Sequence, residues 1–273
     1  MSGRPAPAAE ASALDLLRHG SLVVEGRIAT ASNATLFASV ALDGRQSHCV
    51  YKPVAGERPL WDFPDGTLGH REVAAYQVSA ATGWDVVPPT VWRDGPFGPG
   101  SVQLWVDEVH EPALVDVVPV TQVPDGWLPV LRAEDGAGDP VLLVHADDRR
   151  LQRMAVLDVV LDNADRKGGH VLLTEDGRVH GVDHGVCFNV EDKLRTILWG
   201  WAGRVLPEEA APVLQALVAE LGSDAADSLG GRLRDHLSRR EVERTRERAQ
   251  RLLTAARFPL PPTHGPRIPW PPF

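Results

Sequence analysis

The sequence predicts an α+β fold of two lobes, an N-terminal antiparallel β-sheet lobe with one helix and a mainly α-helical C-terminal lobe. Two observations predict it: short apolar runs separated by turn residues fill the first 110 residues, and longer segments with helical spacing dominate after residue 147. We expect the first lobe at residues 1–110, the second at 111–258 and a Pro-rich extended tail at 259–273.

Composition narrows the class of protein. A chain of 273 residues with 43% hydrophobic and 24% charged residues is typical of a soluble globular protein. Its net charge of -9 argues against broad nucleic-acid binding, which requires excess Lys and Arg. Two cysteines, Cys49 and Cys187, exclude a disulfide framework. No apolar run is long enough for a signal peptide or membrane span, so we expect a cytoplasmic protein without stable membrane insertion.

The first lobe opens with a short helix. Helix formers occupy Ala9–Arg18, and Gly20 follows as a stop signal. Three strands are then predicted at residues 22–28, 36–42 and 47–52. The third strand ends at Lys52.

The remainder of this lobe contains one further helix and two strands. His70–Ala81 has a helical apolar stripe, with Glu72 in its first turn. Strands are expected at Val86–Trp92 and Gly100–Val109. The stretch Glu111–Asp139 holds four prolines and lacks a sustained period, which predicts a junction or insertion.

The most informative stretch is Leu157–Phe188. It reads as the end of a helix over Asp147–Leu161, a polar loop with Asp165 and His170, two short strands joined by a Glu-Asp-Gly turn, and Asp183-His184-Gly185. A hairpin returns both of its ends to one edge of a sheet, so Asp165 and Asp183 should meet.

Two more helices complete the second lobe. Pro207–Leu221 opens with Pro-Glu-Glu, and Ser238–Ala256 opens with the spacing of a capping box between Ser238 and Glu241. Trp199 and Trp201 are candidates for the core of this lobe.

These polar residues suit phosphoryl transfer. That reaction needs cations that neutralise phosphate oxygens and a carboxylate near the attacking hydroxyl. Lys52 at a strand end can reach phosphates, Glu72 can hold its ammonium group, and Asp183 can bind a metal. Glu57, Asp62 and Asp65 compete with Glu72 as partners, but only Glu72 lies on a predicted helix.

The order of these parts resembles the protein-kinase-like superfamily, and the local form is most similar to its phosphatidylinositol 3-/4-kinase and HipA-like branch. There the catalytic loop reads Asp-Arg-His-x-x-Asn or Asn-x-Asp-x-His-x-x-Asn, and this chain has Asn163-Ala164-Asp165-Arg166-Lys167-Gly168-Gly169-His170. The resemblance covers about Ser21 to Trp201. The whole chain is also similar to an actinobacterial family.

The resemblance implies a two-lobed protein-kinase-like fold that binds ATP with Mg or Mn. It makes Asp165 the base, Asp183 the metal ligand and Lys52 the phosphate-binding lysine. The loop Ala31–Thr35, including Ser32 and Asn33, would cover the phosphates. The segment Leu104–Glu108, including Trp105 and Val106, would be the hinge that binds adenine.

Two positions depart from the family pattern. Lys167 stands where the family has His, and His170 stands where it has the metal-binding Asn. Imidazole is a poor ligand for Mg²⁺ but a good one for Mn²⁺ or Zn²⁺. Either the metal differs, one metal suffices, or nucleotide binds without turnover. We expect Lys167 to place a cation near the γ-phosphate.

Two alternatives remain at this stage. One is a regulatory pseudokinase that binds nucleotide without catalysis, since His170 replaces Asn and the glycine-rich loop is missing. The other is a metal-dependent hydrolase, because His180, Asp183 and His184, with His170, have a spacing that suits zinc or manganese. As a kinase, the protein would bind a nucleotide and a small-molecule or protein acceptor. Arginines in the last helix alternate with glutamates, so this helix lacks the basic surface expected of a kinase that acts on anionic lipids. This argues against a lipid substrate.

Overall fold

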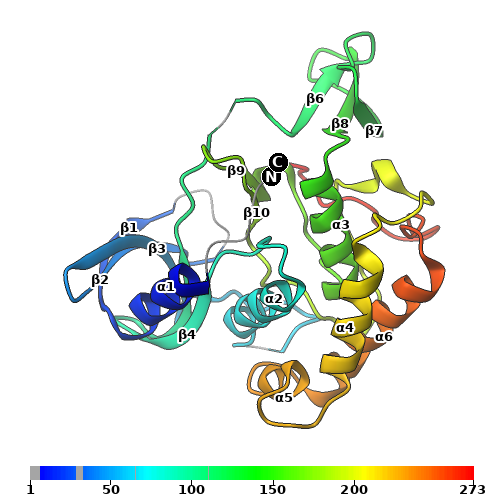
Figure 1. Ribbon diagram of the computed structural model, residues 1–273. Helices are drawn as coiled ribbons and strands as arrows, with labels where there is room; N and C mark the ends of the chain where they lie inside the picture. The colour runs from blue at the N-terminus through cyan, green and yellow to red at the C-terminus, as the bar shows by residue number, and fades with distance from the viewer. Residues whose placement is uncertain (1–6, 29–32, 65, 110) are drawn as a thin grey trace.

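The computed structural model describes residues 7–28, 33–64, 66–109 and 111–273. Figure 1 shows a β-sheet lobe beside a helical lobe, and a small separate sheet above the helical lobe. Buried apolar residues form two cores, one under the first sheet and one through the helical lobe. The predicted two-lobed α+β architecture is therefore confirmed.

The first lobe is a five-stranded antiparallel sheet with the order β1-β2-β3-β5-β4. Its strands are β1 Ser21–Arg27, β2 Leu36–Leu42, β3 Arg45–Pro53, β4 Thr90–Gly95 and β5 Gly98–Leu104. Asp43 and Gly44 join β2 to β3 with positive φ angles of 50° and 76°, as a tight two-residue hairpin requires. Helix α1, Pro7–His19, packs against this sheet and buries Leu16 and Leu17 in its core.

Helix α2, Leu68–Thr82, joins the two lobes. It contacts β4 and β5 of the sheet and α4 and α5 of the helical lobe. Its Ala74, Ala75 and Val78 belong to the core of the helical lobe. The buried Arg71 donates from Nη1 to the Cys187 carbonyl at 2.7 Å and forms an ion pair through Nη2 with Glu241. The helix is thus held from both sides.

Two strand boundaries differ from the sequence expectation. The strand predicted at Gly100–Val109 is β5, which ends at Leu104, and Glu108 instead forms an isolated bridge with Thr174. The strand predicted at Val86–Trp92 begins only at Thr90, as β4. Pro88 and Pro89 have no N–H to give to a ladder, so the backbone before Thr90 cannot pair regularly. Val86 and Val87 are instead buried in the core of the helical lobe.

The stretch expected to be an irregular junction contains strands. β6 Val115–Pro119 and β7 Trp127–Glu134 flank β8 Pro140–Ala146 in a three-stranded antiparallel sheet. The register of β7 shifts between Pro129 and Leu131, and most of its residues are at least partly exposed. β6 and β7 contain proline and are mostly exposed, which hides the period-2 pattern that would have indicated these two strands.

The helical lobe follows. It contains α3 Arg149–Leu161, the hairpin strands β9 Val171–Leu173 and β10 Val179–Gly181, then α4 Ala210–Leu221, α5 Leu229–Leu233 and α6 Arg239–Ala255. Three single-turn 3-10 helices lie at Val54–Gly56, Gly168–His170 and Trp199–Trp201. The predicted capping box of Ser238 and Glu241 starts α6. Among the described residues, no helix combines the length and apolar character required to cross a bilayer.

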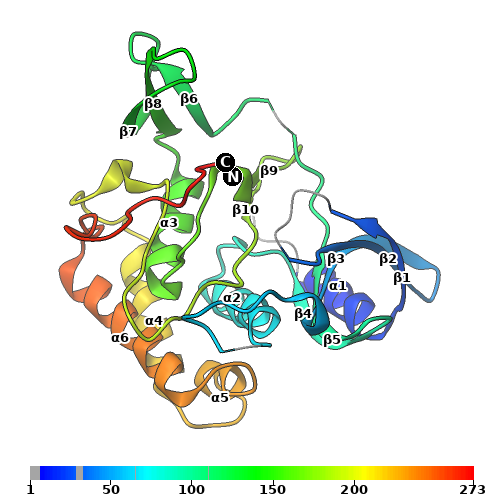
Figure 2. The ribbon, with the colours of Figure 1, turned by 180° about the vertical axis from the view of Figure 1, so that it is seen from behind.

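The Pro-rich tail runs back along the helical lobe toward α3 and β10 (Figure 2). The Arg267 carbonyl accepts hydrogen bonds from Thr196 N at 3.2 Å and Trp199 Nε1 at 2.8 Å. Gly168 N donates to Pro272 O at 2.8 Å, and the Phe273 ring fills the space where a Gly168 side chain would lie. The tail therefore contacts the loop that carries Asp165.

Candidate active site

Lys52, on β3, lies between two carboxylates from different parts of the chain. Its Nζ forms an ion pair with Glu72 of α2 and donates to Asp183 Oδ1 at 2.9 Å. The cation and the two acids singled out in the sequence thus meet in the structure.

The charges of this group stabilise one another. Burial alone would lower the pKa of Lys52, but Asp183 and Glu72 outweigh burial and raise it above its usual range. Lys52, and after it His170, hold the pKa of Asp183 well below that of a free carboxyl group. Both groups therefore remain charged at neutral pH, so Lys52 offers a cation to a phosphate and Asp183 offers an anion to a metal.

Glu72 also fixes the turn that carries Asp183. Its Oε2 accepts a hydrogen bond from His184 N at 3.0 Å. Asp183 adopts a left-handed backbone conformation with φ of 62°, which Asp tolerates better than most residues. Competing acids have other roles: Glu57 accepts from Leu68 N and Gly69 N at the start of α2, and Asp62 pairs with Lys193 at 3.0 Å.

Asn163 sets the geometry of the polar loop. Its side-chain amide donates to Asp158 Oδ1 at 3.0 Å, and its Oδ1 accepts from Asp165 N at 2.9 Å. Burial raises the pKa of Asp165, and Lys167 Nζ, 3.6 Å from Asp165 Oδ2, lowers it in part. A raised pKa makes Asp165 a better proton acceptor than a solvated carboxylate.

Arg166 was not singled out from the sequence, although Asp165-Arg166 matches the Asp-Arg of the family loop. Its fully buried guanidinium binds both oxygens of Asp158 on α3, each at 2.9 Å. It also donates to the carbonyl oxygens of His170 at 3.2 Å and Val182 at 3.1 Å. One side chain thus joins α3, the polar loop and the residue before Asp183.

Asp165, His170 and Asp183 can share a metal ion. Each offers one ligand atom, and these atoms lie within 4.8 Å of one another. His170 Nε2 is 3.4 Å from Asp183 Oδ2. Burial lowers the pKa of His170 to about 4, so its imidazole is neutral and able to bind a metal at physiological pH. Two carboxylates with one imidazole fit Mn²⁺ better than Mg²⁺.

A cavity of about 570 Å³ opens beside these residues. Lys52, Glu72, Asp165 and Asp183 line it, and residues 57–63 form another part of its wall. Lys193 Nζ, which pairs with Asp62, also lies 4.9 Å from the ring centre of Trp61 and ties this wall to the helical lobe. Residues 57–63 show neither a helical nor a strand period, so no local pattern predicts this wall.

The predicted phosphate-covering loop and hinge are placed as follows. Asn33 lines the cavity and accepts a hydrogen bond from Arg58 N at 3.0 Å, whereas Ser32 lies outside the described residues. Trp105 and Val106 do not line it; they border a second cavity, of about 620 Å³. Trp105 N donates to His48 O at 3.0 Å.

The alternative histidine cluster does not assemble. His180 borders the second cavity, and the buried His184 directs Nε2 to Arg166 Nη2 at 2.7 Å. Within the described part of the chain, the residues placed to hold a metal are Asp165, His170 and Asp183. His180 and His184 are not among them.

Residues 149–221 match the family described as phosphatidylinositol 3- and 4-kinase. This range contains Asp165, His170 and Asp183 but neither Lys52 nor Glu72.

Two relatives are similar in sequence. Protein Rv2133c of Mycobacterium tuberculosis is 52% identical over 267 residues, which cover 94% of both chains. Phosphatidylinositol 4-kinase gamma 4 of rice, Oryza sativa subsp. japonica, is 32% identical over 83 residues, 29% of this chain and 14% of the rice protein. The crystal structure of the Helicobacter pylori proinflammatory kinase CtkA aligns with a TM-score of 0.44 and 10% identity, over 89% of this chain and 94% of that one.

Proposed function

This chain belongs to the protein family of Mycobacterium tuberculosis Rv2133c, and we propose that it is a kinase-like phosphotransferase that uses ATP and a divalent metal. One observation carries the proposal: Lys52 on the sheet lobe bridges Glu72 and Asp183, beside Asp165, in a single cavity. Phosphoryl transfer depends mainly on such positioning and on charge neutralisation.

Each residue has a chemical part in this reaction. Lys52 binds phosphate oxygens of ATP, and Glu72 keeps its ammonium group in place. Asp165 orients the acceptor hydroxyl and takes its proton as the γ-phosphoryl group passes to the acceptor oxygen and ADP leaves. A Mn²⁺ or Mg²⁺ ion held by Asp183, with His170 and Asp165, would supply further neutralisation of phosphate charge. Lys167 places another cation beside the reacting group.

The acceptor in this proposal is a hydroxyl on a soluble small molecule or a protein. On α6, Arg244 pairs with Glu247 at 2.5 Å and Arg246 pairs with Glu243 at 2.6 Å. These partly exposed arginines are neutralised by their neighbours, which supports a soluble acceptor over a phosphoinositide in an anionic bilayer.

A nucleotide-binding pseudokinase is the second candidate. It is supported by His170, which stands where the family has the metal-binding Asn and whose imidazole is a poor ligand for Mg²⁺.

Transfer of label from γ-labelled ATP, with Mn²⁺ or Mg²⁺, to the chain itself or to a panel of hydroxyl acceptors tests the proposal. Asp165→Asn should lower transfer by about 10²–10⁴-fold while ATP still raises the melting temperature. Asp125→Asn is the control, because Asp125 is exposed and does not line the cavity, and it should keep full activity. ATP stabilisation without any transfer would establish the pseudokinase instead, and the absence of both would refute either function.

A further inference from the structure

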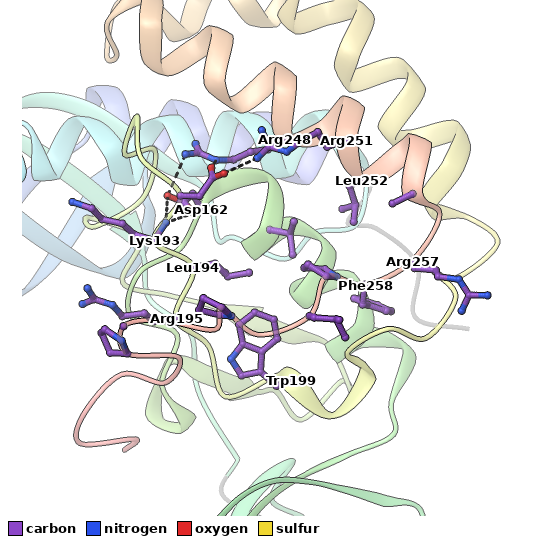
Figure 3. A pocket seen from close by; sticks show the side chains of 18 of the residues that line it. Asp162, Lys193, Leu194, Arg195, Trp199, Arg248, Arg251, Leu252, Arg257 and Phe258 are labelled. Carbon is purple, nitrogen blue, oxygen red and sulfur yellow. Dashed lines mark hydrogen bonds and ion pairs between the residues drawn. The ribbon is translucent and has the colours of Figure 1, made fainter.

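The Pro-rich tail is attached to the helical lobe at few points. Residues 257–266 form one side of a cavity of about 610 Å³, with the end of α3, residues 192–199 and α6 on its other sides (Figure 3). Within the described part of the chain, the hydrogen bonds of residues 259–273 are made by two carbonyl groups, those of Arg267 and Pro272. These two groups therefore decide where the tail lies.

The first carbonyl binds a segment that is paired with the polar loop. Arg267 O accepts from Thr196 N at 3.2 Å and from Trp199 Nε1 at 2.8 Å. Thr196 in turn forms a parallel bridge with Arg166, the residue that follows Asp165. The tail is thus bonded to the segment that lies directly beside the proposed base.

The second carbonyl binds the polar loop itself. Pro272 O accepts from Gly168 N at 2.8 Å, and the Phe273 ring lies against Gly168, which is buried. A Cβ atom on Gly168 would overlap this ring, whereas a Cβ atom on Gly169 would meet nothing within 4 Å. The contact is therefore specific to one of two adjacent glycines.

The turn that the tail contacts carries a proposed metal ligand. Gly168–His170 is a single 3-10 turn, closed by backbone bonds from His170 N to Lys167 O at 3.2 Å and from Val171 N to Gly168 O. Two of its three residues are glycines, which lose more conformational freedom on ordering than any other residue. An isolated turn of this kind is unstable, so contacts from elsewhere in the chain have to hold it in one conformation.

We propose that the tail is a positioning element for metal binding: Pro272 and Phe273 fix the turn at Gly168 so that His170 faces Asp183. This proposal rests on the metal-dependent function proposed above. The residues that line the cavity beside Lys52 all lie between positions 33 and 195, so the tail does not fill that cavity, and a blocking role has no support.

Binding of Mn²⁺ by the full chain tests the proposal, measured without nucleotide from the electron paramagnetic resonance signal of the free ion. Gly168→Ala displaces the Phe273 ring and should weaken Mn²⁺ binding by about 10–100-fold, the usual effect of losing a group that orients a metal ligand. Gly169→Ala is the matched control and should bind Mn²⁺ as the parent chain does. Circular dichroism at the temperature of the titration checks that each variant is folded, which separates a change in affinity from a loss of structure.

A double variant shows whether the effect passes through the tail. Phe273→Ala alone should weaken Mn²⁺ binding by a similar factor. Adding Gly168→Ala to it should cause little further loss, because the ring that the new Cβ atom would displace is already gone. An equal loss from Gly168→Ala with and without the Phe273 ring, or parent affinity in both single variants, would overturn the proposal.

Label transfer from γ-labelled ATP separates this proposal from the function on which it rests. Transfer by the parent chain that falls in Gly168→Ala at limiting Mn²⁺, and recovers in excess Mn²⁺, supports both. Equal transfer by these two chains at limiting Mn²⁺ refutes the positioning role and leaves the phosphotransferase proposal intact. Mn²⁺ binding that depends on Phe273, in a chain that transfers no label, supports the positioning role and refutes the phosphotransferase. A parent chain that does not bind Mn²⁺ refutes the positioning role.

Discussion

Replacing Arg166 by Met should destabilise the protein strongly. The Asp158 carboxylate is completely buried, and Arg166 is its only cationic partner within the described part of the chain. Loss of one member of a buried ion pair costs about 3–5 kcal/mol, because the other charge is left without compensation. A typical domain has only about 5–15 kcal/mol of stability in total.

A second variant isolates the cause. Asp158→Asn added to Arg166→Met removes the stranded charge, so the double variant should be more stable than Arg166→Met alone. Asn at this position can still accept the bond from Asn163. Arg153→Met is the control, because Arg153 lies on α3 like Asp158. It breaks only the partly exposed ion pair with Glu209, 3.3 Å apart, and should lower the free energy of unfolding by about 0–1 kcal/mol.

Urea unfolding followed by circular dichroism gives the midpoint and slope for each variant. The expected order of midpoints is parent and Arg153→Met highest, the double variant between, and Arg166→Met lowest. The reasoning is refuted if Arg166→Met unfolds at the same urea concentration as Arg153→Met, or if Asp158→Asn makes the Arg166→Met variant less stable.

Three further predictions concern the loop itself. Lys167→Ala should raise the pKa of Asp165 further, so the acid limb of the pH–rate profile moves to higher pH; an unchanged profile removes the role of Lys167. His170→Asn should raise the ratio of Mg²⁺-supported to Mn²⁺-supported transfer, measured in a metal titration. An unchanged ratio would show that His170 is not a ligand. Phe273→Ala removes a half-exposed ring from Gly168 and should cost about 1–2 kcal/mol in urea unfolding; no loss would mean that this contact adds no stability.

The convergence of Lys52, Glu72 and Asp183 could be predicted because each lies in, or directly after, an element whose period is clear in the sequence. Only the position of Glu72 within its helix differs: α2 begins at Leu68, so Glu72 lies beyond the first turn in which it was expected. The capping box of α6 was predictable for the same reason, since Ser238 and Glu241 act through local spacing alone. Local signals and motif order thus sufficed for the lobes and the central acids.

Other features depend on distant contacts that no local pattern encodes. The roles of Arg166 and of the wall at residues 57–63 follow from partners far along the chain, such as Val182 and Lys193. Strands β6 and β7 were missed because proline and exposure weaken their alternation. The separation of Trp105 from the cavity beside Lys52 reflects how the lobes pack, which sequence spacing does not fix.

The position of α2 limits how this protein can be regulated. Switching by displacement of a helix requires two alternative packings of similar free energy. Here an outward swing would strip Ala74 and Val78 from one core and break the contact of Arg71 with Glu241. Any movement of α2 that separates Glu72 from Lys52 therefore carries the cost of exposing these core residues and breaking this ion pair.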